Sequence, residues 1–598
     1  MPRSVHRLVP VAVAALTCTA LAAGCGGEAT GDGADASTTL KVLYRAESHN
    51  GVRVFDTVRS QLAAVGIRAE GLPMSDQGYA RVLRDPERAE AGDWDIAIAA
   101  RANDGADTTA DFLGPLVGGA AAFPPTGSNF GLYENPDTTA AVAEARAGGD
   151  SPAAAAAWAR ADRQVMTDAA VYPIATPQQA SYAASSIGDR VYVPAFQNYD
   201  PTRVTKCVGD RRGTTCVKPG SAENRTLHLV GAGDVDVMDP NLSYYSIGYL
   251  GLRLWSRQLF AFSNDPGKPA PDLAVAAPSP QPVTLADGST GTAFRVQLRP
   301  QARWGTTPAR PVTGPDVLRG VKRTCNPVLP FGGLDRYRDL IEGFDAFCDG
   351  FEALGPDASV EDVATAVDAE VPGLQADAGS VTFTFTRAGM TTADAVGLLT
   401  SPAFAPAPQE VLADLPGRLQ VPNMVASGPY RVQSYEPGRS IVLTPNPAWV
   451  AASDPVRERH FDQVVVDQTH PNQDQALKLL TDNSPRADLA WDSFVPASVV
   501  PRLVKADDPN LTFGATYALD PYLVFNTSAA SELGDVAVRR SLSTALDRTA
   551  LVDAVGGTLL NSPLTHLLPP GTLGSQPYAD PYPYDPERAA AVLAAQLR

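Results

Sequence analysis

The sequence predicts an α/β fold built from more than one lobe. The chain has 598 residues, of which 44% are hydrophobic, so it is too long for one core and too apolar for general disorder. Residues 40–100 alternate between strand-like and helix-like patterns, as in a sheet covered by helices. The chain also ends in a helical pattern at 585–597, while 40–45 is its first strand-like segment. We therefore expect the carboxy-terminal helix to pack beside this strand, so that both ends complete one sheet.

Periodicity predicts the elements in the first third of the chain. The helix at 54–65 has apolar residues on one face and ends at Gly66, a residue suited to a helix carboxyl end. The segment 93–99 is nearly continuously apolar, as in a buried strand. Residues 137–171 are Ala-rich and helical, with a break at 148–149. The expected strands of this part are 40–45, 67–72, 93–99 and 171–184.

The pattern changes after a polar, irregular connector at 206–224. Turn signals at Asp287-Gly288 and Pro437-Gly438 separate strand-like segments. Thr313 stands near the N-cap of a predicted helix, and Asp585-Pro586 starts the last one. The expected strands are 226–230, 294–298, 381–386, 430–434, 440–443 and 522–526. The expected helices are 313–323, 536–555 with an interruption near Asp547, and 585–597.

The first 25 residues predict an export signal. Arg3 and Arg7 precede an apolar run at 8–23, which is too short for a membrane span. Small residues directly before Cys25 resemble a bacterial lipobox, in which the cysteine carries the lipid, although Ala22 stands where Leu is usual. A polar tether follows at 26–38. The alternative is an ordinary cleaved signal peptide with a stray cysteine.

Export implies an oxidising compartment, in which disulfides are stable. Cys18 lies within the signal, and the spacing of the four cysteines after Cys25 suggests the pairs Cys207–Cys216 and Cys325–Cys348. A metal site is the alternative, but the sequence has no C-x-x-C and no paired histidines to support it.

Several motifs become specific when they are taken together and in order. They are Met238-Asp239-Pro240 with 250–262, Pro271-Asp272-Leu273-Ala274, 294–304 with 312–321, 426–430, and 522–547. This combination resembles the bacterial extracellular solute-binding proteins of family 5, which serve peptide and nickel ABC importers. The resemblance implies a two-lobe α/β fold of the periplasmic-binding-protein type II, with an extra small domain in lobe one.

The order of the resembling segments is rotated. Residues 226–598 resemble the first two thirds of the family and 40–205 its last third, so we expect a circularly permuted chain. Two unrelated fused domains are the alternative, which would leave a half sheet with exposed edges at each end. The expected parts are a signal (1–25), a tether (26–38), lobe two (40–175 and 521–598), a return segment to lobe one (176–205), a connector with a disulfide (206–224), and lobe one (226–520, extra domain about 272–400).

The resemblance also implies ligand-binding residues. Dipeptide binders of the family hold the ligand's ammonium with an Asp and its carboxylate with an Arg, and Asp104 and Arg45 stand at these positions. The family often has an aromatic residue where Arg101 stands, and the loop 105–110 departs from its usual form, which leaves the specificity open. A solvated loop Asp and a surface Arg are the alternative.

Three residues of lobe one are expected to meet the ligand: Tyr245, Ser246 and Trp491. Core packing or helix capping is the alternative for each of them. His49 is the one histidine expected near Arg45, and nickel ligation there is a weaker hypothesis. We expect no cofactor and no metal.

Other function classes lack support in the sequence. The net charge is −18 with no basic cluster, which argues against nucleic acid as a partner. There is no G-x-S-x-G, H-E-x-x-H or G-x-x-x-x-G-K, so no enzyme is predicted. Asp234-Val235-Asp236 lacks the spacing of an EF-hand.

The function that the resemblance implies is capture of short peptides by lobe closure and their delivery to a membrane permease. The expected partners are the peptide, the permease and ATPase subunits of an ABC importer, and the membrane through the lipid anchor, with the protein a monomer on the outer face of the cell membrane. The alternative is a sensor or surface interaction lipoprotein on the same scaffold.

Overall fold

The structure is a computed structural model. It describes residues 38–46, 48–101, 109–124, 127–149, 151–208, 215–216, 225–231, 233–235, 237–243, 246–263, 269–326, 331, 334–355, 357–411, 424–470, 473–492, 494–516 and 518–596. The predicted signal peptide, nearly all of the tether and Cys25 lie outside the described residues.

One sheet is built from both ends of the described chain. Its strand order is β2-β1-β3-β25-β4. The strands are β1 (Thr39–Arg45), β2 (Arg68–Met74), β3 (Ile96–Arg101), β4 (Val171–Pro173) and β25 (Leu519–Phe525). Strand β1 is parallel to β2 and β3, whereas β25 is antiparallel to β3 and β4. The prediction that both ends complete one sheet is therefore confirmed, and we call it the terminal sheet.

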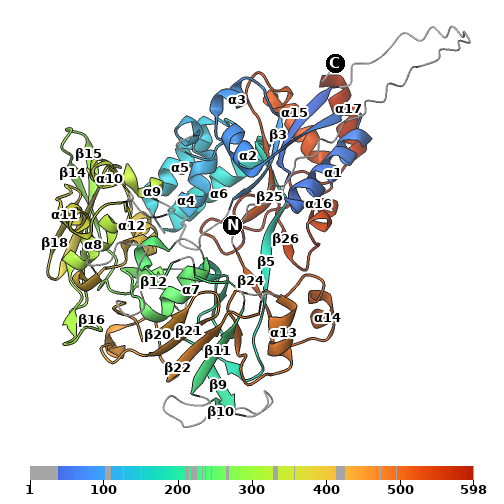
Figure 1. The fold of residues 1–598 in the computed structure, drawn as a ribbon. Coiled ribbons are helices and arrows are strands. Elements are labelled where there is room, and N and C mark those ends of the chain that lie inside the picture. The colour runs from blue at the N-terminus through green and yellow to red at the C-terminus, as the bar shows by residue number, and fades with distance from the viewer. Residues whose placement is uncertain are drawn as a thin grey trace, which may run out of the picture. The chain divides into compact units, whose positions relative to one another are not determined.

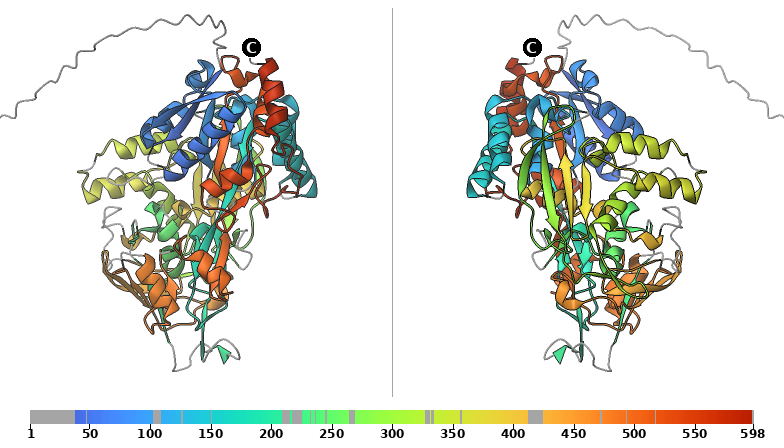
Figure 2. Two further views of the ribbon diagram at one scale, coloured as in Figure 1. Left: turned by 90° about the vertical axis from the view of Figure 1, so that its right-hand side faces the viewer. Right: turned by 90° about the vertical axis from the view of Figure 1, so that its left-hand side faces the viewer.

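Helices cover both faces of the terminal sheet. Leu40 and Val42 share a hydrophobic cluster with Leu593 of the last helix, while Leu43, directly after Val42, lies in a second cluster with Trp158. This alternation is the period of two expected for a strand buried on both faces. The helices are α1 (His49–Ala64), α2 (Asp76–Leu83), α3 (Pro86–Glu90), α4 (Thr109–Val117), α5 (Pro136–Gly148), α6 (Pro152–Thr167), α15 (Val536–Thr544), α16 (Arg548–Ala554) and α17 (Pro586–Gln596). Figures 1 and 2 show α17 at the same end as the blue strands that begin the described chain.

A second sheet has the order β20-β21-β22-β11-β23, and we call it the central sheet. The strands are β11 (Thr226–Val230), β20 (Tyr430–Glu436), β21 (Ser440–Pro445), β22 (Gln463–Asp467) and β23 (Leu489–Ala490), accompanied by α7 (Ser246–Trp255), α13 (Gln473–Thr481) and α14 (Val500–Lys505). The short strands β6 (Ile187–Gly188), β7 (Tyr192–Val193), β8 (Asn198–Tyr199), β9 (Thr205–Val208) and β10 (Thr215–Cys216) precede it. Residues from 183–204 and from 227–491 contribute to the same core cluster.

Two chain segments connect the terminal and central sheets. Strand β5 (Ala175–Tyr182) follows β4 of the terminal sheet, and Ala183 directly after it bridges Leu489 of the central sheet. Strand β24 (Leu511–Ala515) pairs antiparallel with β5 and leads into β25. A short strand, β26 (Asn561–Pro563), pairs with the other edge of β5. We call β5 and β24 the crossing strands.

A third sheet, β14-β15-β19-β18, has its own hydrophobic core. Its strands are β14 (Pro280–Thr284), β15 (Thr290–Gln297), β18 (Leu374–Asp377) and β19 (Ser380–Phe385), with helices α8 (Gly314–Arg323), α9 (Asp335–Arg338), α10 (Phe344–Glu352), α11 (Val360–Asp368) and α12 (Thr392–Leu399). The paired strands β12 (Phe260–Phe262) with β13 (Pro269–Pro271), and β16 (Arg303–Trp304) with β17 (Arg310–Pro311), lie next to these elements in sequence. These elements span the region in which the extra domain was expected.

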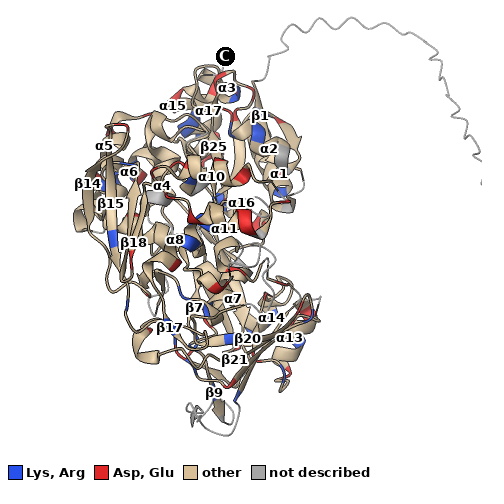
Figure 3. Ribbon diagram, turned by 60° about the vertical axis from the view of Figure 1, so that its left-hand side comes forward, with Lys and Arg blue, Asp and Glu red and all other residues tan. Residues whose placement is uncertain are grey.

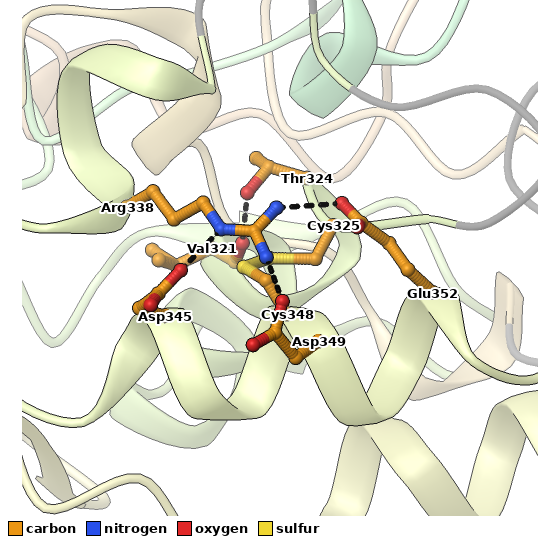
Figure 4. Close-up of a disulfide and its surroundings, with 8 residues drawn as sticks. All are labelled: Val321, Thr324, Cys325, Arg338, Asp345, Cys348, Asp349 and Glu352. Atoms are coloured by element: carbon orange, nitrogen blue, oxygen red, sulfur yellow. Dashed lines mark hydrogen bonds and ion pairs between the residues drawn. A yellow bond between two sulfur atoms is a disulfide. The ribbon is translucent and has the colours of Figure 1, made fainter.

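A disulfide lies in this third region, as predicted. Cys325 and Cys348 are bonded across 23 residues and are both fully buried. Arg338 lies beside the bond and pairs with Asp345, Asp349 and Glu352 of α10 (Figure 4). Because the disulfide joins the segment after α8 to α10, it fixes the helix that carries these carboxylates.

Some predicted boundaries shift for local reasons. Helix α1 begins at His49 rather than at residue 54, because the Ser48 side chain accepts a hydrogen bond from the Gly51 amide at 3.0 Å and caps the helix. Strand β3 begins at Ile96 rather than at 93, and the Asp95 carboxylate instead accepts the Lys41 amide at 2.8 Å. The connector 206–224 holds the strand pair β9–β10, so it is not irregular throughout.

Candidate functional site

The carboxyl ends of β1 and β3 lie at one edge of the terminal sheet. The strands are parallel, with Val42 opposite Ile96, so Arg45 and Arg101, the last residue of each, are placed at the same edge. Strand β25 runs the opposite way and begins there, with Leu519 opposite Arg101. Since β25 follows the crossing strand β24, this edge is the one turned toward the central sheet.

The carboxyl ends of the parallel strands in the central sheet are directed toward the terminal sheet. Strand β11 is parallel to β22 and β23, and the bridge from Ala183 to Leu489 is antiparallel. Because β5 runs from the terminal sheet toward the central one, β23 and its parallel neighbours run back toward the terminal sheet. Ligands of open α/β sheets bind outside the carboxyl ends of strands, and here two such edges are directed at each other.

Charged and phenolic groups gather at the terminal-sheet edge. The Tyr79 hydroxyl donates to the Ile98 carbonyl at 2.7 Å. Burial raises the pKa of Tyr79, and the nearby charge of Arg45 opposes that shift. The Arg101 guanidinium lies 5.9 Å from the ring centre of Phe112. The edge therefore places two arginines next to aromatic side chains that belong to the core of the terminal sheet.

Asp520 adds a carboxylate to the same edge. It lies where the β25 register shifts, between Leu519 and Tyr522, and its side chain is half-buried. Burial raises the pKa of Asp520, and the charge of Arg45 counteracts this effect. From the sequence, residues 519–521 are expected to belong to a hinge, and no motif marks Asp520 as a ligand-binding residue.

The loop after β11 is held by neighbouring side chains. Asp234 accepts hydrogen bonds from the Tyr435 hydroxyl at 2.7 Å, the Gly438 amide at 2.8 Å and the Gln468 side chain at 2.8 Å. A Cβ at Gly231 would lie 1.9 Å from an Asp492 carboxylate oxygen, so a side chain does not fit there. Asp234 thus has a structural role in this loop, and no group of His, Cys, Asp or Glu side chains in the described part of the chain is arranged to hold a metal ion.

Comparison with models of protein families finds one family that the chain matches. Residues 269–597 match the sequence model described as bacterial extracellular solute-binding proteins, family 5 Middle. The chain belongs to this family. The resemblance predicted from the motifs, and the two-lobe periplasmic-binding fold class, are therefore confirmed, while the circular permutation stays a prediction.

Solved structures of similar proteins include peptide binders. The chain is 25% identical to clavulanic acid biosynthesis oligopeptide binding protein 2, with 67% of each chain covered and a TM-score of 0.46. It is 19% identical to the Escherichia coli murein tripeptide binding protein MppA, covering 63% of this chain and 67% of that one, with a TM-score of 0.40. It is 17% identical to Listeria monocytogenes OppA bound to peptide, covering 63% and 68%, with a TM-score of 0.38. Among curated proteins the chain has no match.

The structure describes some of the predicted ligand residues of this solute-binding protein and not others. Arg45 lies at the terminal-sheet edge, whereas Asp104 and Tyr245 lie outside the described residues. Ser246 begins α7, but its side chain is not among those described, nor is that of His49. Trp491 is 1% exposed, packs in the core of the central sheet, and donates its indole N–H to the Gly233 carbonyl at 3.0 Å. A ligand-binding role of these residues stays a prediction, and Trp491 serves here as a core residue.

The structure describes only one of the two side chains of the second predicted disulfide. The strand pairing sets Cys216 directly opposite Cys207, and Cys207 is disulfide-bonded. The Cys216 side chain is outside the described set, so the Cys207–Cys216 bond stays a prediction. No helix in the described part of the chain is long and apolar enough to cross a membrane.

Proposed function

We propose that this family 5 solute-binding protein captures short peptides between the terminal and central sheets and delivers them to an ABC permease. Family membership supports solute binding outside the cytoplasm. The facing carboxyl edges supply a place where a ligand is enclosed from both sides. In this proposal Cys25 carries a lipid that holds the protein at the outer face of the cell membrane, and the permease works with an ATPase subunit.

The observation that carries the peptide assignment is the position of Arg45 at the terminal-sheet edge. A peptide has an ammonium and a carboxylate, and burying either without an opposite charge is costly. Arg45 supplies the cation for the carboxylate, and Asp104 supplies the anion for the ammonium. A basic group at this edge matches the requirement of the carboxylate better than a purely apolar cleft would.

Closure in this proposal bends the crossing strands. Two connections between lobes form a hinge when few other contacts restrain them, and here β4–β5 and β24–β25 carry the chain from sheet to sheet. Bending at these strands would bring the two carboxyl edges together over the ligand. The closed form would then be the one that the permease recognises.

We also propose that the chain order is circularly permuted relative to the family. The family match begins at residue 269 and runs to 597, yet most strands of the terminal sheet come from residues 39–173. A sheet shared by both chain ends tolerates such a rearrangement, since domain termini often lie near each other at the surface.

The Arg45→Ala variant tests the peptide assignment. We expect its affinity for a co-purified or screened peptide to fall roughly 10- to 100-fold, because a hydrogen bond to a charged group contributes about 1.5–3 kcal/mol. Isothermal calorimetry measures the change, after mass spectrometry has identified ligand retained on purification. Arg59→Ala removes an exposed arginine of α1 that pairs with Asp56 and serves as the control. Unchanged affinity in both Arg45→Ala and Asp104→Ala would reject the charged clamp.

A further inference from the structure

We propose that a pocket at the outer end of the central sheet is a second binding site, which takes a small organic carboxylate. We call it the distal pocket, and its lining includes Arg203, Trp449, Glu458, Arg459 and His460. Its volume is about 480 Å³, which lies within the roughly 300–1,000 Å³ that is usual for small-molecule sites. The pocket is independent of the proposed peptide site.

Strand directions place the distal pocket away from the terminal sheet. Strand β21 ends at Pro445 and β22 begins at Gln463, and the two are antiparallel. Because β22 runs with β11 toward the terminal sheet, the connection 446–462 lies at the opposite edge of the central sheet. Arg203 reaches the pocket from the segment between β8 and β9. A ligand bound here would leave the space between the two sheets free.

One wall of the distal pocket already holds a carboxylate. The Arg203 guanidinium donates to one oxygen of Glu458 at 2.9 Å, and Nε2 of His460 lies 2.9 Å from the other. The side chains of Arg203 and His460 are 15% and 13% exposed, whereas that of Glu458 is 48% exposed. An ion pair with an exposed partner contributes little to stability. The Glu458 carboxylate can therefore turn out to solvent, and a ligand carboxylate can take its place.

Arg459 supplies a further cation on the neighbouring wall. Its guanidinium carbon lies 5.1 Å from the ring centre of Trp449, and its Nη1 donates to the Asn446 and Pro429 carbonyls at 3.1 and 3.4 Å. Among the side chains that the structure describes, no carboxylate pairs with Arg459. A guanidinium held against an aromatic ring presents a fixed fork of N–H groups, which matches the two oxygens of a carboxylate.

The distal pocket therefore has a surplus of positive charge. Arg203 and Arg459 face the single negative charge of Glu458, while Asp454 and Arg457 are buried and paired with each other at 3.4 Å. The whole chain has a net charge of −18, so this cationic hollow contrasts with the rest of the protein and favours an anion. The indole ring beside Arg459 adds apolar surface for the body of an organic acid.

Calorimetry of the full-length protein with benzoate as the probe tests this site. We expect benzoate to bind at least roughly 10-fold more tightly than benzamide, which has the same shape without the charge, since bonds to charged groups are the strong ones. Arg459→Gln should weaken benzoate binding by roughly 10-fold for the same reason. Glu458→Gln should strengthen it, because the variant removes the competing carboxylate. Arg439→Gln, at an arginine that is 74% exposed in another part of the central sheet, is the control and should bind like the wild type.

Each other outcome overturns the inference. Equal binding of benzoate and benzamide, or no binding of benzoate, would show that the pocket does not select a carboxylate. Inorganic phosphate binding as tightly as benzoate would replace the carboxylate by anions in general. Unchanged benzoate affinity in both Arg459→Gln and Glu458→Gln would place the probe elsewhere. Benzoate should bind equally to Arg45→Ala, so this result is separate from the success or failure of the proposed peptide binding.

Discussion

At the scale of single residues, one cluster of buried charges holds the fold together. Asp272, in the motif Pro271-Asp272-Leu273-Ala274, is fully buried and accepts Arg257 and Arg457 at 2.7 Å each. The guanidinium of Arg257 also donates to the Ser453 carbonyl at 2.8 Å. The motif that helps identify the family is thus a structural ion cluster, whereas Arg45 and Asp520 lie at a sheet edge.

Replacing Asp272 by alanine is expected to destabilise the protein strongly. The substitution leaves Arg257 and Arg457 buried with fewer opposite charges, and breaking a buried pair costs about 3–5 kcal/mol. Urea unfolding followed by circular dichroism measures the loss. Asp287→Ala, in an exposed turn, is the control and should cost far less. A small loss for Asp272→Ala would mean that the remaining carboxylate, Asp454, satisfies both arginines.

A second residue, Asp162 in α6, predicts a dependence of stability on pH. The residue is fully buried and accepts the Leu567 amide at 2.9 Å, and burial raises its pKa to about 7. Because the folded state binds the proton more tightly than the unfolded state, stability is full below about pH 4 and falls as pH rises to about 7, by up to about 4 kcal/mol.

Thermal melts at pH 5 and pH 8 check this expectation. Asp162→Asn cannot ionise, so its melting temperature should change less between the two pH values than that of the wild type. The control Asp357→Asn removes an exposed carboxylate and should leave the wild-type difference intact. Equal pH dependence in wild type and Asp162→Asn would show that other groups cause it.

At the scale of elements, the last helix belongs to the core of the first strand. Leu593 and Ala589 of α17 are each 1% exposed and lie in the cluster that contains Leu40 and Val42. Leu593→Ala should therefore destabilise the protein by about 2–5 kcal/mol, through lost burial and the cavity left behind. Leu559→Ala is the matched control, because Leu559 is 40% exposed. Equal losses of unfolding free energy for the two variants would contradict the assigned packing.

At the scale of the whole molecule, the shared sheet predicts that the chain can be joined at its present ends and opened at another position without loss of the fold. A rearranged chain would join residue 596 to residue 39 through a short flexible linker and open between residues 216 and 225. It should fold with the same secondary structure, because α17 and β1 lie in one cluster and the strand pair β9–β10 remains whole. Circular dichroism, melting temperature and peptide affinity provide the comparison, and a chain that fails to fold would count against the permutation.

The distribution of charge is a further property of the whole molecule. Lysine and arginine are interspersed with aspartate and glutamate over the described ribbon (Figure 3), within a chain whose net charge is −18. This mixture differs from the continuous basic track that a polyanion requires.

The sequence alone determined the family and most of the elements. Hydrophobic periodicity and turn residues depend on a few neighbouring positions, so segments such as 226–230 and the turn at Asp287-Gly288 were predicted and appear in the structure. The disulfide Cys325–Cys348 was also predictable, since spacing and compartment limit the pairings. Family motifs such as 271–274 likewise carry a local signature.

Only the tertiary structure decided which charges share an edge. Asp520 is 475 positions from Arg45 along the chain, and the two come near each other because β25 pairs into the sheet that β1 begins. Trp491, expected at the ligand, lies in the core because its indole N–H meets the Gly233 carbonyl. Such facts depend on long-range strand pairing and side-chain packing, which no local pattern encodes.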